Sequence, residues 1–158
     1  VLFDTERAPL CAEEYAQLKE RALRSAADFQ CLFDAIPQKN ASDRPVRSTF
    51  YSKVPRTAQE MYDHTKCVNP YYFGEIDVQT DDEGSILACR QRGFQALEAT
   101  DGYLENRVIC GSYDEEWSLR KVLRRFLWHD RIHARAMYRM AVRMFGKDAI
   151  PDPFCFEE

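Results

Sequence analysis

The chain has 158 residues, of which 45% are hydrophobic and 30% are charged, the size and mix of one globular domain. Six glycines and seven prolines exclude a collagen-like or linker composition, and 13% aromatic residues argue against disorder. No apolar run approaches the roughly 18 residues that span a bilayer, no amino-terminal signal is visible, and the net charge of -4 argues against nucleic acid as a partner. We therefore expect a cytoplasmic single domain over residues 1–158 with no membrane partner, which can be a piece of a longer protein because it begins with Val1.

Proline, glycine and asparagine divide the chain into four amphipathic segments, and the apolar residues of each recur at steps of three and four, the helical period. The predicted helices cover residues 11–36, a segment from 57 to about 76, about 84–108, and 118–146, with a loop over 37–56 and connections over 77–84 and 110–117. Because no strand pattern competes, the sequence predicts an all-α four-helix bundle.

Two signals mark the second predicted helix. Thr57 and Glu60 have the spacing of a capping box, in which each side chain binds the backbone amide of the other residue. Pro70 cannot donate to the carbonyl of Lys66, so we expect a kink or an early end near Asn69.

Six cysteines are spread along the chain without any C-x-x-C pair, which argues against a zinc ribbon or a thioredoxin-type motif. Without a secretory signal, we expect buried free thiols rather than a disulfide framework.

All three histidines fall on apolar stripes. His129 and His133 belong to the stripe of the last helix, which consists of Leu119, Val122, Phe126, His129, His133, Ala136 and Met140. His64 lies on the stripe of the second helix, which consists of Met61, His64, Val68 and Tyr71. Histidines four residues apart share one helix face at about 6 Å, so two imidazoles from the last helix and a third from its neighbour can ligate one ion. Three protein ligands leave positions open, as in a catalytic metal site. The alternative is that each histidine is a core residue without a metal.

Two stretches resemble the DinB/YfiT-like putative metalloenzymes. Residues Thr57–Glu75, TAQEMYDHTKCVNPYYFGE, are similar to the helix that carries the first histidine of that family, and residues Trp117–Met137, WSLRKVLRRFLWHDRIHARAM, are similar to its last helix. The resemblance implies an up-down-down-up four-helix bundle with a crossover after the second helix. It also implies that His64, His129 and His133 bind a divalent transition metal: zinc, nickel, iron or manganese.

Characterised members of this family are largely thiol-dependent, among them bacillithiol transferases and a mycothiol-dependent maleylpyruvate isomerase. The resemblance therefore implies a metal-dependent transferase that passes a low-molecular-weight thiol to a small-molecule substrate, or a metal-dependent hydrolase. A divalent ion on three neutral imidazoles lowers the pKa of a bound thiol or water, which suits both reactions.

Four residues near the histidines are candidates for weaker roles. Cys67 lies one turn from His64 and is a candidate fourth ligand, although a buried free thiol is the favoured interpretation. Tyr71 is a candidate for orienting a substrate, although core packing is favoured. The capping box explains Glu60, and Asp130 points about 100° away from His129 and is expected at the surface.

The last helix also carries a basic face, made of Arg120, Lys121, Arg124, Arg125, Arg131, Arg135, Arg139 and Arg143, with Trp128 among them. It is either a solvated face, neutralised by the acidic residues of 75–83, or a contact surface such as a homodimer interface. In the second case Arg124, Trp128, Arg131 and Arg135 are the candidate interface residues. The rival to the metalloenzyme is then a metal-free helical interaction module that uses this face.

Overall fold

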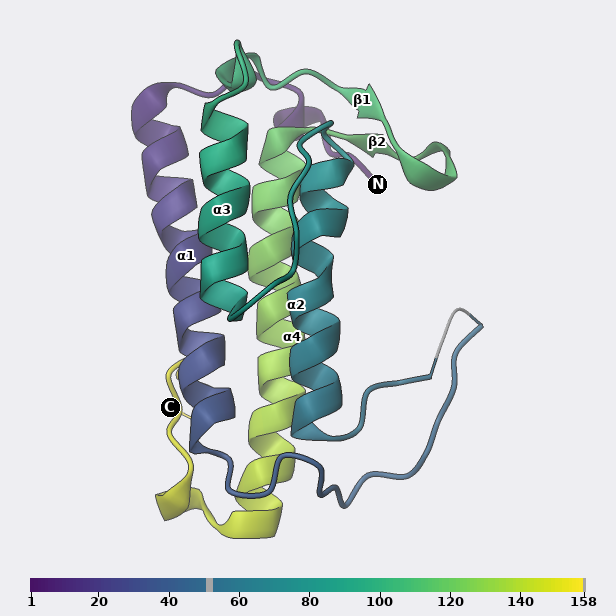
Figure 1. Ribbon diagram of the computed structural model, residues 1–158, viewed down its shortest axis with the longest axis vertical. Helices are drawn as coiled ribbons and strands as arrows, with labels where there is room; N and C mark the ends of the chain where they lie inside the picture. Colours follow the sequence, from purple (N-terminus) through teal and green to yellow (C-terminus); the bar gives the residue numbers. More distant parts are fainter. Residues whose placement is uncertain (51–52, 158) are drawn as a thin grey trace.

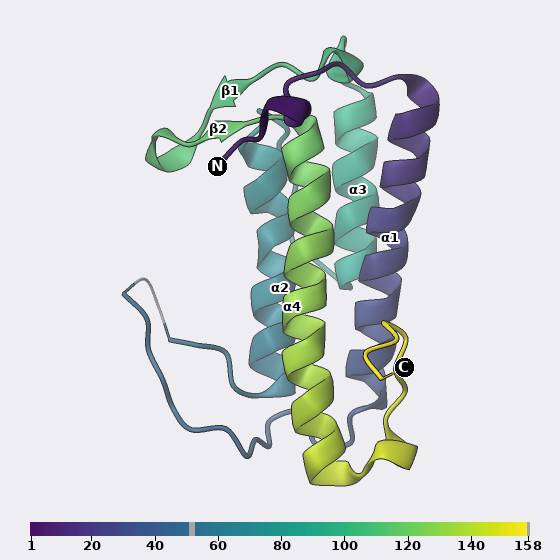
Figure 2. The ribbon, with the colours of Figure 1, turned by 180° about the vertical axis from the view of Figure 1, so that it is seen from behind.

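The computed structural model describes residues 1–50 and 53–157. Over these residues it contains four α-helices: α1 (Ala12–Ala35), α2 (Ala58–Gly74), α3 (Ile86–Glu98) and α4 (Leu119–Phe145) (Figure 1). Helix α4 packs against α1 and α2, and α3 packs against the same two helices, so α3 and α4 lie diagonally opposite each other (Figure 2). The predicted all-α four-helix bundle is confirmed. None of the helices in the described residues is long and apolar enough to cross a membrane.

The helices follow an up-down-down-up course. Helices α2 and α3 run in the same direction, and residues 75–85 return along the outside of the bundle to connect them (Figure 1). An extended segment of this length reaches about 35 Å, whereas the 13 residues of α3 rise only about 20 Å. The short crossover suffices because α3 is short.

Helix α2 begins where the sequence predicts. Thr57 Oγ1 accepts from the amide of Glu60 at 3.0 Å, and the Glu60 carboxylate accepts from the amide of Thr57 at 3.2 Å. Of the kink or early end expected near Asn69, the early end is wrong, because α2 continues through Pro70 to Gly74. Asn69 Nδ2 donates to the carbonyl of Lys66 at 2.7 Å, which replaces the hydrogen bond that Pro70 cannot make.

Helix α3 is shorter than predicted and ends at Glu98 rather than near residue 108. Gly102 and Asn106 adopt positive φ angles of 70° and 55°, which turn the chain away from the helical path. The Asn106 side chain donates to the carbonyls of Glu6 and Ala8 at 2.8 and 2.7 Å and ties this turn to the amino-terminal segment.

The remaining elements are short. The connection predicted over 110–117 contains a small antiparallel pair, β1 (Ile109–Cys110) and β2 (Glu116–Trp117). Single turns of 3-10 helix cover Asp4–Glu6, Tyr103–Glu105, Ser112–Asp114 and Lys147–Ala149.

The core contains one charged pair among its apolar side chains. Arg90 of α3 and Asp130 of α4 are fully buried, so the prediction that Asp130 lies at the surface is wrong. The Arg90 guanidinium also donates to Asn69 Oδ1 of α2 at 2.9 Å and to the carbonyl of Ala22 of α1 at 3.0 Å, and it stacks 4.2 Å from the ring of Phe126. One side chain thus contacts all three neighbouring helices.

The six cysteines are all free thiols, as predicted. Only Cys89 is buried, however, and the other five are exposed, so the expectation of buried thiols is wrong for them.

Candidate metal centre

The structure brings the three histidines together between α2 and α4. One ring nitrogen from each of His64, His129 and His133 lies within 4.8 Å of the other two. The Nε2 atoms of His64 and His129 face each other at 3.3 Å, and the three ring centroids are 4.4 to 5.0 Å apart. His64 is therefore level with the pair on α4, which the spacing in the sequence alone does not determine.

Burial keeps the three imidazoles neutral. His129 is 7% exposed, and His64 and His133 are half-buried. Burial lowers the pKa of His129 to about 2, with a further contribution from His133 and His64, and lowers the pKa of His133 to about 4. Burial also lowers the pKa of His64. Because metal ligation needs an unprotonated nitrogen, all three are ready to donate lone pairs at neutral pH.

The donor set fits a transition metal. Two imidazole nitrogens on a tetrahedral zinc ion, each about 2.0–2.1 Å from it, lie roughly 3.3 Å apart, and the Nε2 atoms of His64 and His129 already have that separation. Among residues 1–50 and 53–157, these three histidines are the only cluster of at least three histidine, cysteine or acidic side chains with ligand spacing. Their all-imidazole character suits zinc, nickel or iron.

The candidates for weaker roles lie outside this cluster. Cys67 is exposed, and its thiol donates to the carbonyl of His64 at 3.1 Å. Partial burial of this thiol, together with the nearby carboxylates of Asp82 and Asp63, raises the pKa of Cys67 and favours the protonated form. Tyr71 is 41% exposed and packs on Tyr72 and Trp117 rather than on the histidines, so its expected core position is wrong.

Two neighbours of the histidines were missed in the sequence. The ring of Tyr72 lies edge-on to that of His129, with centroids 6.0 Å apart, because the apolar stripe of α2 steps from Val68 to Tyr72. The Arg125 guanidinium stacks 5.5 Å from Tyr72 and 4.8 Å from Trp128. Arg125 precedes His129 by four residues, and this spacing is the signal that could have identified it.

Within residues 1–50 and 53–157 no carboxylate accepts a hydrogen bond from the three histidines. His129 Nδ1 is buried and has no hydrogen-bond partner in the described part of the chain. Arginines lie close enough to lower two of the pKa values further. Arg125 and Arg90 lower the pKa of His129, and Arg44 lowers the pKa of His133. In the part of the chain that the structure describes, the centre therefore lacks the carboxylate that commonly orients a metal-bound histidine.

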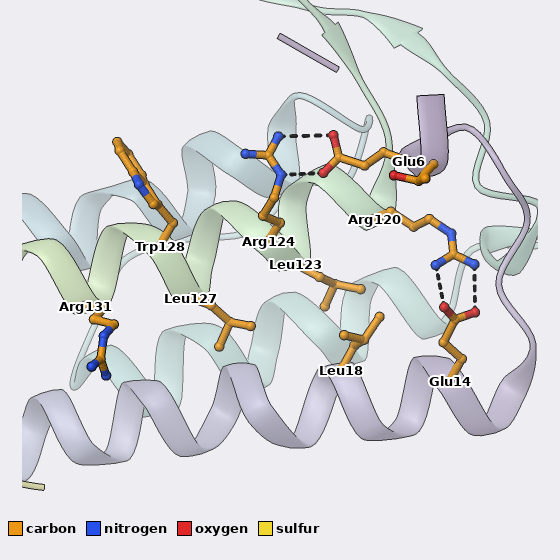
Figure 3. A pocket seen from close by; sticks show the side chains of 10 residues that line it. Glu6, Glu14, Leu18, Arg120, Leu123, Arg124, Leu127, Trp128 and Arg131 are labelled. Atoms are coloured by element: carbon orange, nitrogen blue, oxygen red, sulfur yellow. Dashed lines mark hydrogen bonds and ion pairs between the residues drawn. The ribbon is translucent and has the colours of Figure 1, made fainter. Parts of the chain in front are cut away.

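The amino-terminal half of the basic face is neutralised within the chain. Figure 3 shows Arg120 paired with Glu14 and Arg124 paired with Glu6. Both pairs border a cavity of about 530 Å³, whose apolar lining residues include Leu18, Leu123 and Leu127. In the same view Trp128, which is 50% exposed, points away from α1. Arg131 donates to the carbonyl of Phe154 at 3.1 Å.

The sequence offered the acidic residues of 75–83 as the partners of this basic face. The structure gives it other acidic partners. They come from the amino-terminal segment, the first turn of α1, the loop after α1 and the β1–β2 connection: Glu6, Glu14, Asp43 and Glu115. Lys121, moreover, is buried over the ring of Trp117 rather than solvated.

The comparisons with known proteins give no relative. No family model, no curated protein and no solved structure matches this chain.

Proposed function

We propose that His64, His129 and His133 bind one divalent transition metal and that the chain is a metal-dependent enzyme of the thiol-transferase or hydrolase type. The observation that carries the proposal is the convergence of three neutral imidazoles, two of them with Nε2 atoms 3.3 Å apart. Zinc, nickel, iron and manganese are the candidate ions, and a low-molecular-weight thiol is the candidate second cofactor.

The chain's own residues have defined parts in this proposal. Three histidines hold the ion and leave coordination positions for a small-molecule substrate. The half-buried edges of His64 and His133 give access from solvent, whereas His129 is packed against Tyr72. When bound, a divalent ion supplies a Lewis acid that lowers the pKa of a bound water or thiol.

The course of the helices supports a place in the DinB/YfiT-like family. The resemblance implies a crossover after the second helix, and residues 75–85 provide one. It also implies one histidine on the second helix and two on the last, level with one another, and the three cluster in this way. We propose the family on these two grounds.

Elemental analysis of the purified protein tests the metal site. We expect about one equivalent of a transition metal in the wild type and none in His129→Ala/His133→Ala. Cys67→Ser is the matched control, because Cys67 neighbours His64 but lies outside the cluster, and it should retain the metal. Equal and negligible metal in all three proteins, after reconstitution with zinc, nickel and iron, would overturn the proposal.

The rival function is a metal-free interaction module, and one observation favours it. Trp128 is half-exposed and lines the cavity on the α1–α4 face together with Leu123 and Leu127. A homodimer that buries Trp128 would dissociate in Trp128→Gln and in the charge reversal Arg131→Glu. Sedimentation of these variants, with metal content measured alongside, separates the two functions.

A further inference from the structure

A second cavity of about 460 Å³ lies along α4, on the part of the helix that carries and follows His133. Four arginines, one isoleucine and one alanine line it: Arg44, Ile132, Arg135, Ala136, Arg139 and Arg143. Ile132 precedes His133 in the chain, and Ala136 follows it by one helical turn, so the apolar wall of the cavity flanks His133. Two lining residues of the cavity are thus close neighbours of His133 on α4, although His133 itself does not line it.

The loop after α1 is fixed to α4 at this point. Ser42 Oγ contacts Met140 Sδ at 3.4 Å, and Asp43 accepts two hydrogen bonds from the Arg143 guanidinium at 2.6 and 2.8 Å. These two contacts place the next residue, Arg44, over α4. Arg56 Nη1 also donates to the Arg44 carbonyl at 3.3 Å.

Most arginines of the cavity have no acidic partner among the described residues. Arg135, Arg139 and Arg143 follow one another at intervals of four residues on α4, a spacing at which like charges repel. Only Arg143 has an acidic partner, Asp43, within residues 1–50 and 53–157. The amino-terminal half of the same helix differs, because Arg120 and Arg124 each have a glutamate partner there.

We propose that this cavity binds the phosphate group of a small phosphorylated molecule, with Arg44, Arg135 and Arg139 as its ligands. A phosphate monoester carries nearly two negative charges and three acceptor oxygens, and guanidinium groups bind such oxygens in pairs. The cavity has the volume of a small-molecule site, and the net charge of -4 argues against a nucleic acid.

The position of the cavity links this ligand to the histidines. The organic part of the molecule would lie on Ile132 and Ala136 and point toward His133. A phosphorylated small molecule is then the substrate class of the histidine site, and this step rests on the proposed function.

Titration of the chelator-treated full chain with phosphate probes tests the cavity without the metal. We expect binding of inorganic phosphate and tighter binding of phenyl phosphate, whose ring adds contact with Ile132 and Ala136. Arg139→Gln removes a charge-assisted hydrogen bond and should weaken both by roughly tenfold. Arg107→Gln, which removes an exposed arginine far from the cavity in the chain, is the matched control and should bind both probes as the wild type does.

The outcomes separate this inference from the proposed function. Loss of phosphate binding in Arg139→Gln supports the phosphate site even if elemental analysis finds no metal, and then only the metal proposal fails. Equal phosphate affinity in the wild type and Arg139→Gln, or no binding in the wild type, overturns the inference whether or not metal binds. Binding of inorganic phosphate alone overturns the organic ligand, and tighter arginine-dependent binding of a single-stranded oligonucleotide overturns the small-molecule class.

Discussion

Arg90 and Asp130 form a fully buried ion pair that joins the diagonally opposite helices α3 and α4. The Arg90 Nη1 and Nη2 atoms donate to the two carboxylate oxygens of Asp130 at 2.5 and 3.0 Å. Arg90 also donates to Asn69 of α2 and to the carbonyl of Ala22 of α1, so hydrogen bonds from this one side chain connect α3 to the other three helices. Asp130 neighbours His129 in the chain, so the same pair holds the turn that carries this histidine.

The first prediction concerns the contribution of this ion pair to the stability of the folded protein. Asp130→Asn leaves the Arg90 charge buried without a counterion, and we expect a loss of about 3–5 kcal/mol in the free energy of unfolding. The double variant Arg90→Met/Asp130→Leu removes both charges and should recover much of that loss. Urea denaturation of the wild type and both variants measures the difference. A loss below about 1 kcal/mol in Asp130→Asn would contradict the burial of an intact ion pair.

The bundle and its histidines could be predicted because both follow from periodicity. A step of three or four residues places His129 and His133 with the apolar residues of one stripe, and His64 with those of another. The level of His64 relative to the pair depends on how α2 packs on α4, which no local pattern encodes.

Two of the errors come from pairing between residues distant in the chain, and a third comes from a local hydrogen bond of one side chain. Asp130 was placed by its angle on one helix, but Arg90 from another helix makes its burial possible. The end of α2 was placed by Pro70 alone, but the Asn69 side chain satisfies the carbonyl that Pro70 leaves free. The arginines of α4 were assigned to the acids of 75–83, but the bundle places Glu6 and Glu14 against them.

A second prediction tests how α2 tolerates its proline. Asn69→Ala leaves the Lys66 carbonyl without its hydrogen bond and should destabilise the protein by about 1–3 kcal/mol. In a Pro70→Ala background the backbone amide of residue 70 can donate to that carbonyl, so Asn69→Ala should cost less. The double-mutant cycle should therefore give a coupling of about 1 kcal/mol.

Chemical denaturation of the four proteins in this cycle measures the coupling. Asn69 also accepts from Arg90 Nε, so part of the loss should persist in both backgrounds. Equal losses in the two backgrounds would show that the side chain of Asn69 does not compensate for Pro70.

Ligand binding provides a third prediction. An ion that binds only the folded chain at 100 times its dissociation constant stabilises it by about 2.7 kcal/mol, which corresponds to a rise of roughly 5–10 °C in the Tm of a protein of this size. We expect this rise on addition of zinc or nickel to the chelator-treated wild type and to Cys67→Ser. His64→Ala should show a much smaller rise, and an equal rise in this variant would assign the effect to another site.

The fourth prediction is a loss of stability in acid that depends on the histidines. Burial lowers the folded-state pKa of His129 to about 2, below the unfolded value of about 6.5. The unfolded chain therefore binds more protons in mild acid, so the contribution to stability is complete above pH 6.5 and is lost as the pH falls toward the folded-state pKa. For His129 the loss between pH 7.5 and pH 5 is on the order of 2 kcal/mol, and His133 acts in the same direction.

Urea denaturation of the metal-free protein at these two pH values measures the loss, with His129→Gln as the control. Glutamine does not titrate, so the variant should lose about 2 kcal/mol less than the wild type over the same interval. The Nε2 atom of His64 lies 3.3 Å from that of His129, and the pKa of His64 is lowered as well. His64→Gln should therefore also reduce the loss of stability between the two pH values. If the wild type and His129→Gln lose stability equally, His129 is not held neutral by burial, and the low-pH weakness belongs to other groups.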